Sequence, residues 1–132
     1  MSITQGINHL GLAVNHLETT RDFFCSVLDF QQKMIDPSYP RASVSNGFVT
    51  LTLWQVDHSL VVQPFHRRQN IGLHHLALTV ETEQALHTLY DKIKSYPGCV
   101  IEFAPELLSG GPRKHMMFCE PGGIRIELTW NG

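Results

Sequence analysis

Hydrophobic and polar positions alternate identically in two stretches of the chain, 7–14 and 73–80, which lie sixty-six residues apart. Successive side chains of a β-strand point to opposite faces. The leucines and valine of each stretch therefore share one face, and a histidine shares the other with small residues. The pattern predicts two strands, each with an apolar face for a core and a second face that carries one imidazole, His9 or His75. A repeat of this length indicates a duplicated module and not a solenoid.

The rest of the first half predicts one helix and three strands. Phe23, Phe24, Val27 and Leu28 fall at helical spacing, so we expect a helix over 18–28 with Thr19 or Thr20 as its cap. The strands follow after turn signals, with Asn46-Gly47 as a hairpin turn. They are expected over 29–35, 41–45 and 48–56.

The second half predicts the same order of elements. Thr82 is the expected cap of a helix that Tyr96-Pro97-Gly98 ends. Residues 105–112 are rich in glycine and proline and predict a flexible loop that could act as a lid. The expected strands cover 100–104, 113–119 and 123–130. We therefore divide a single domain, 1–132, into a first module at about 7–56, a linker at 57–72 and a second module at about 73–130.

Composition narrows the function classes. A chain of 132 residues with 42% hydrophobic and 17% charged residues can fold as one compact domain. Its net charge of −2 argues against a nucleic-acid partner. No stretch approaches the roughly 20 apolar residues of a membrane helix, and the first residues do not resemble a signal peptide, so we expect a cytoplasmic protein without membrane contact. Three scattered cysteines, an odd number, favour reduced thiols.

The last predicted strand carries a carboxylate, Glu127. An offset of seventy-five residues aligns Ile126-Glu127-Leu128 with Leu51-Thr52-Leu53. Glu127 therefore stands where the first module has Thr52. Its apolar neighbours indicate a half-buried strand, and a half-buried carboxylate needs a cation or hydrogen-bond donors.

These features together resemble the vicinal oxygen chelate superfamily, which includes glyoxalase I, extradiol dioxygenases, fosfomycin-modifying thiol transferases and bleomycin-binding proteins. The resemblance covers about 7–130 and rests on the two His-Leu-x-Leu strands, the paired aromatic residues of the first helix and the ending Pro-Gly-Gly-x-x-x-Glu-Leu. It implies an α+β fold in which two βαβββ modules form an open, mostly antiparallel barrel around one divalent metal. By position the ligands would be His9, residue 52, His75 and Glu127.

The chain departs from glyoxalase I at residue 52, where that enzyme has a glutamate that binds the metal and carries a proton. Threonine is a poor ligand, and Gln55 would reach the site only through a bulge. Three ligands remain, His9, His75 and Glu127. Two histidines and one carboxylate are typical of non-haem Fe(II) oxygenases. Iron is therefore the favoured cofactor, and Zn, Ni, Mn or Co also suits these ligands.

The leading hypothesis is thus a small metal-dependent, dioxygenase-like enzyme that acts on a small oxygenated substrate. His115 is the candidate acid or base beside the metal, with a surface histidine as the alternative. Arg113 and Arg125 could hold an anionic substrate group. A glyoxalase-type lyase or isomerase, a thiol transferase, and a non-catalytic binding protein of the bleomycin-resistance type are the other possibilities. The resemblance also implies a homodimer.

Overall fold

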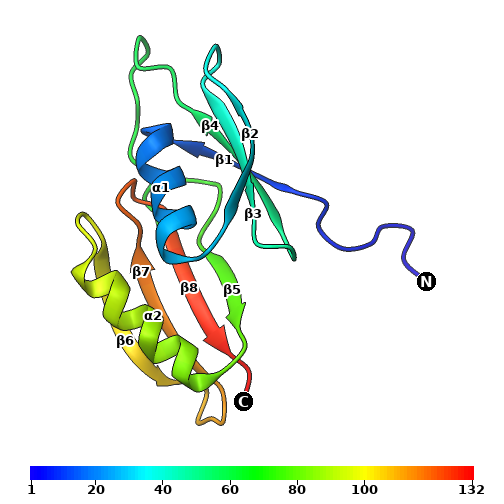
Figure 1. Ribbon diagram of the computed structural model, residues 1–132, viewed down its shortest axis with the longest axis vertical. Helices are drawn as coiled ribbons and strands as arrows, with labels where there is room; N and C mark the ends of the chain where they lie inside the picture. Colours follow the sequence, from blue (N-terminus) through cyan, green and yellow to red (C-terminus); the bar gives the residue numbers. More distant parts are fainter. The chain divides into compact units, whose positions relative to one another are not determined.

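The computed structural model describes residues 1–132 as two compact units, Met1–Val62 and Gln63–Gly132. Each unit contains one four-stranded sheet and one helix (Figure 1). Both units have the same element order, which is strand, helix and three strands. Neither helix has the length and apolar character that crossing a membrane requires.

The first unit has the sheet order β1-β4-β3-β2. Its first and last strands, β1 and β4, pair in parallel, and the other neighbours are antiparallel. The helix connects the two outer strands of the sheet, β1 and β2. The elements are β1 (Leu10–Val14), α1 (Leu17–Val27), β2 (Gln31–Asp36), β3 (Arg41–Ser45) and β4 (Thr50–Gln55).

The second unit repeats this topology with the order β5-β8-β7-β6, and again only its first and last strands are parallel. The predicted α+β fold with two βαβββ modules and mostly antiparallel sheets is therefore confirmed; each sheet stays open. The elements are β5 (Leu76–Val80), α2 (Glu83–Ser95), β6 (Val100–Leu107), β7 (Lys114–Cys119) and β8 (Arg125–Trp130).

The apolar face of each sheet forms a core with the helix of the same unit. Helix α1 buries Phe23 and Phe24, whose rings meet edge to face, and α2 buries Leu86 and Ile93. Burying such side chains is the main source of stability in a domain of this size. The other face of each sheet, which we call its helix-free face, carries polar side chains together with small and aromatic ones. The strands contribute Leu12, Val14, Ala42, Val44, Leu51 and Leu53 to the first core, and Met116, Phe118, Ile126 and Leu128 to the second.

The two helices begin differently. Thr82 Oγ1 accepts a hydrogen bond from the backbone N–H of Ala85, which confirms the predicted cap of α2. The predicted threonine cap of α1 is wrong, because that helix already begins at Leu17 and Thr20 is buried within it. Its first free N–H, that of Leu17, donates instead to the Gln55 side chain. A residue distant in sequence thus replaces the local cap.

The predicted lid loop is shorter than expected. Strand β6 continues through Pro105 to Leu107, so only residues 108–113 connect it to β7. Proline is tolerated in this strand because β6 lies at the edge of its sheet and its pairing register shifts between Phe103 and Glu106. A residue without an N–H at such a bulge costs no ladder hydrogen bond.

Candidate metal centre

The strand register places Thr52 and Glu127 at equivalent points of the two sheets. Thr52 pairs with Gly11 across β1 and β4, and Glu127 pairs with Ala77 across β5 and β8. Gly11 and Ala77 are themselves related by the sixty-six-residue repeat. The two modules therefore differ chemically at one shared position, with a hydroxyl in the first and a carboxylate in the second.

The second unit gathers His75, Glu127 and His115 on its helix-free face. His75 lies one residue before β5, and its Nε2 is 3.2 Å from Glu127 Oε1. His115 comes from β7, and its Nδ1–H donates to the other carboxylate oxygen, Glu127 Oε2, at 2.6 Å. The His115 Nε2 lies 3.5 Å from Glu106 Oε1, and Phe103 packs against the ring. The carboxylate of Glu127 is thus held between two imidazoles.

The pair of His75 and Glu127 has the spacing of two ligands on one metal ion. Nitrogen and oxygen ligands lie roughly 2.1 Å from a divalent metal, so two of them are about 3.0 Å apart at a right angle and about 3.4 Å apart at the tetrahedral angle of zinc. The observed 3.2 Å lies between these separations and is also within hydrogen-bond distance. No group of three or more His, Cys, Asp or Glu side chains has the geometry to hold a metal ion. The second unit therefore offers two adjacent ligand atoms, and further ligands would have to be added to them.

His9 belongs to the first unit, where it lies one residue before β1 with an exposed side chain. Its Nδ1–H donates to Asn8 Oδ1 at 2.7 Å, and its Nε2 has no partner. The structure thus brings three of the four predicted site residues together in the second unit and describes His9 in the first. A histidine just before the first strand of each unit is the shared feature.

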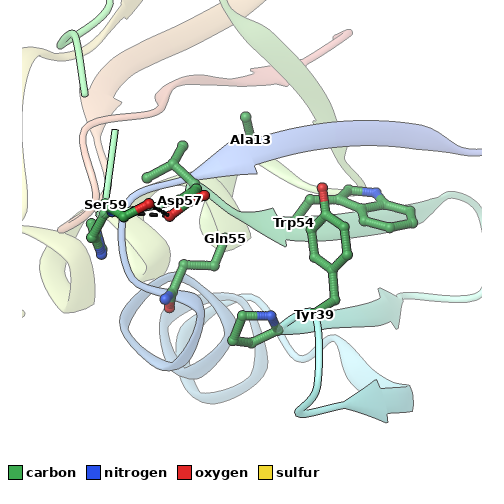
Figure 2. A pocket seen from close by; sticks show the side chains of 9 residues that line it. Ala13, Tyr39, Trp54, Gln55, Asp57 and Ser59 are labelled. Atoms are coloured by element: carbon green, nitrogen blue, oxygen red, sulfur yellow. Dashed lines mark hydrogen bonds between the residues drawn. The ribbon is translucent and has the colours of Figure 1, made fainter. Parts of the chain in front are cut away.

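Two residues weighed for the fourth ligand position are engaged elsewhere. Thr52 Oγ1 accepts a hydrogen bond from the indole N–H of Trp54 at 3.0 Å. Gln55 Oε1 accepts from the backbone N–H of Leu17 at 3.0 Å, and Figure 2 shows its side chain directed toward α1. Strand β4 pairs regularly along its length, so no bulge turns Gln55 to the side of Thr52.

The two candidate anion-binding arginines also have different settings. Arg125 donates two hydrogen bonds to Glu102, at 2.6 and 3.1 Å, and its Nη1 lies 3.3 Å from His74 Nδ1. Its guanidinium therefore has partners within the protein, and its use for a substrate anion stays a prediction. Arg113 is exposed in the short loop before β7. The sequence pattern pointed to neither Glu102 nor His74 as a neighbour of the site.

Burial and neighbouring charges shift the pKa values of several groups near this site. Partial burial and then the Arg125 guanidinium lower the pKa of His74, and the Arg125 hydrogen bonds lower the pKa of Glu102. Burial raises the pKa of the Cys119 thiol, which lies on β7, and raises that of Cys99 to about 12. A thiol with a raised pKa is a poor nucleophile at neutral pH. The chemistry of this face is therefore that of imidazoles and carboxylates.

The first unit has a pocket of its own, of about 610 Å³, beside the end of β4 (Figure 2). Tyr39 and Trp54 line it and meet edge to face, with ring centroids 4.8 Å apart. Arg41 lies over the Trp54 ring at 5.0 Å. Gly11 lies beside the hydrogen bond between Trp54 and Thr52, and a Cβ added there would lie 3.3 Å from Thr52 Oγ1 and 3.7 Å from Trp54 Nε1. An aromatic wall of this kind suits a small, partly apolar molecule.

Comparisons with known proteins agree with this architecture. A domain from Frankia sp. EAN1pec described as a glyoxylase/bleomycin resistance protein/dioxygenase is 20% identical, with a TM-score of 0.83 over 98% of this chain and 99% of that one. A glyoxalase family protein from Enterococcus faecalis is 19% identical, with a TM-score of 0.74 over 97% and 99%. The fosfomycin resistance protein FosX from Listeria monocytogenes is 16% identical, with a TM-score of 0.75 over 98% and 96%.

These structural similarities establish the fold alone. None of the curated proteins compared with the chain matches it. The sequence profile of one family, however, matches residues 6–128, which is nearly the whole chain. The chain therefore belongs to the glyoxalase/bleomycin resistance protein/dioxygenase superfamily.

Proposed function

We propose that the protein is a small metal-dependent enzyme that binds a small oxygenated substrate at a centre formed by His9, His75 and Glu127, with dioxygenase-like chemistry. The observation that supports this proposal is the convergence of His75 Nε2 and Glu127 Oε1 at 3.2 Å. A nitrogen lone pair that faces an anionic oxygen at this distance favours a cation between them, and a proton on the nitrogen would fill the same place. Two histidines and one carboxylate fit Fe(II), with Zn, Ni, Mn or Co as other suitable ions.

The residues around the centre have distinct roles in this proposal. The bound metal supplies Lewis acidity and open positions for vicinal oxygens of the substrate. His115 orients Glu127 through the hydrogen bond to Oε2 and is the group placed to hold or move a proton next to it. Glu106 approaches the other nitrogen of the same imidazole, with its Oε1 at 3.5 Å. Burial of both His115 and Glu127, whose side chains are 13% exposed, limits competition from water.

A glyoxalase-type lyase or isomerase is less well supported. Such a reaction needs a group at position 52 that can carry a proton from carbon, as the glutamate of glyoxalase I does. Thr52 is instead an acceptor for Trp54, and Gln55 is an acceptor for Leu17. A thiol transferase and a metal-free binding protein also belong to this superfamily. The paired imidazole and carboxylate argue against the metal-free form.

The test is the metal content of protein purified without chelators, compared with His75→Ala and Glu127→Ala. Near-stoichiometric metal that both substitutions abolish would support the centre, and loss in His9→Ala would assign the third ligand. The matched control is His87→Ala, because His87 is an exposed histidine on α2 that lies 4.0 Å from Glu83. Iron would direct attention to catechols, whereas nickel, zinc or manganese would favour the lyase or transferase class. A wild-type protein that stays metal-free after anaerobic reconstitution with Fe(II) would refute the proposal.

The proposal includes a small-molecule substrate and a homodimer as partners. The dimer rests on the superfamily resemblance and is tested separately by the size of the protein in solution. Sedimentation or gel filtration that gives a monomer at all concentrations would remove the dimer and leave the metal centre untouched.

A further inference from the structure

The residue immediately before each candidate metal-binding histidine contacts its Nδ1. In the first unit Asn8 Oδ1 lies 2.7 Å from His9 Nδ1, and in the second unit His74 Nδ1 lies 2.7 Å from His75 Nδ1. Asn8 and His74 are related by the same sixty-six-residue offset as the histidines. The two units thus repeat one contact with two different side chains.

The direction of the hydrogen bond in the first unit follows from the amide oxygen of Asn8, which faces His9 Nδ1. An amide oxygen only accepts hydrogen bonds, so His9 must carry its proton on Nδ1. Neutral imidazole then has its lone pair on Nε2. Nε2 of His9 has no partner within its unit, which leaves this lone pair available.

The second unit needs an additional group, because two imidazole nitrogens can exchange the roles of donor and acceptor. Arg125 provides it: its Nη1 lies 3.3 Å from the same His74 Nδ1. A guanidinium only donates, so His74 Nδ1 is held as an acceptor, and its single lone pair is shared between Arg125 at 3.3 Å and His75 at 2.7 Å. The proton between the two rings therefore belongs to His75 Nδ1, and Nε2 of His75 keeps the lone pair. Two hydrogen bonds from Arg125 to Glu102 fix the guanidinium in this position.

This arrangement matters because Glu127 favours the other tautomer of His75, with the proton on Nε2. Its Oε1 lies 3.2 Å from His75 Nε2, and a neutral imidazole with its proton on Nε2 could donate to that carboxylate. The resulting hydrogen bond would block the atom that is needed for a metal. An acceptor at Nδ1 opposes this outcome. Partners of this kind are known to orient metal-binding histidines and to fix their tautomer.

We propose that Asn8 and His74 are positioning residues that fix His9 and His75 in the tautomer with a free Nε2, and that Arg125 makes His74 an acceptor. The purpose assigned to this tautomer rests on the proposed metal centre. The hydrogen-bond directions do not, and they can be measured in protein without metal. They predict that an asparagine at position 74 would replace both His74 and its dependence on Arg125.

The test is heteronuclear NMR of the imidazole nitrogens in chelator-treated protein, at a pH where the histidines are neutral. Glu127→Ala serves as the background because it removes the competing acceptor at Nε2. We expect His75 to carry its proton on Nδ1 in this background and to shift toward the Nε2–H form in His74→Ala. His74→Asn should retain the Nδ1–H form. Arg125→Gln should mix the two forms, and adding His74→Asn should restore the first. His9 should respond in the same way to Asn8→Ala.

The second readout is zinc affinity with Glu127 present. His74→Ala should weaken binding about 10- to 100-fold, and His74→Asn should restore most of it. His87→Ala is again the control. If Arg125 acts through Glu102 alone, His74→Asn will not rescue Arg125→Gln. That result would refute the role assigned to Arg125. A His75 that carries its proton on Nε2 in the Glu127→Ala background, or equal behaviour of His74→Ala and His74→Asn, would overturn the inference. The NMR result does not depend on whether the metal centre exists, so the two proposals can fail separately.

Discussion

Removal of the His115 imidazole tests whether Glu127 is a supported metal ligand. Both nitrogens of His115 face carboxylates, Glu127 Oε2 at 2.6 Å and Glu106 Oε1 at 3.5 Å, and its side chain is 13% exposed. His115→Ala leaves Oε2 without its donor and frees the carboxylate to rotate away from His75. We therefore expect the metal to bind more weakly while the fold is retained.

The size of this effect follows from the contact that is lost. A hydrogen bond to a charged group contributes about 1.5–3 kcal/mol. Loss of an outer partner of a metal ligand typically lowers affinity about 10- to 100-fold, which corresponds to roughly 1.4–2.8 kcal/mol. The two ranges agree. His115→Gln, whose amide can still donate to Oε2, should lose less than His115→Ala.

The assay is a competition titration of zinc against a chelator of known affinity, with circular dichroism as the check of folding. His87→Ala provides the baseline for loss of a histidine that does not contact the site. An affinity within about twofold of wild type for a folded His115→Ala protein would refute the supporting role of His115, since a twofold change is less than about 0.5 kcal/mol.

Three further predictions concern stability and reactivity. Glu120 is 1% exposed and accepts hydrogen bonds from two backbone N–H groups of the turn that follows it. Glu120→Ala should therefore lower the free energy of unfolding, measured by urea denaturation, by about 2–4 kcal/mol. Glu120→Gln should lower it by less. Cys99, with its pKa raised to about 12 by burial, should react with a thiol reagent at pH 8 far more slowly in native than in unfolded protein; equal rates would contradict its burial. The hydrogen bond from Lys114 lowers the pKa of Glu83, so this pair stabilises the protein above the ordinary glutamate pKa and loses its effect as the pH falls through the lower folded value. The stability difference between wild type and Glu83→Gln should therefore shrink in acid.

The fold was predictable from sequence because the same pattern of hydrophobic and polar positions occurs in both modules. Alternation in the first and last strand of each module identified the core faces, and the structure buries the predicted residues Leu12, Leu51, Leu53, Ile126 and Leu128. Contacts between residues distant in sequence determine two features that the pattern did not predict. The cap of α1 comes from a side chain thirty-eight residues away, and Pro105 is accommodated by a bulge at a sheet edge. Neither feature can be recognised from the residues that are neighbours in sequence.

The sequence predicted that three of the candidate residues share one sheet face, but it did not predict their neighbours. His75, Glu127 and His115 share one face because strand periodicity and pairing put them there. Which side chain contacts which atom depends on register between strands far apart in sequence. Glu106 reaches His115 because β6 and β7 pair at these two residues, and Glu102 reaches Arg125 across twenty-three positions. The sequence allowed Arg125 to be an anion-binding residue but gave no sign that it donates to Glu102.

Comparison of the two units shows how the duplication helps to assign chemistry. Each unit retains a histidine before its first strand and a polar acceptor before that histidine, although the acceptor is Asn8 in one and His74 in the other. His74 can donate as well as accept, and if it donated to His75 the proton of His75 would move to Nε2, next to Glu127. Only the second unit has this carboxylate, and it also has Arg125, which fixes the direction of the hydrogen bond between the two histidines. The first unit has Thr52 at the equivalent point and needs no such control. The extra arginine therefore occurs where the competing carboxylate occurs, which is the distribution expected if the tautomer of the histidine is what the network maintains.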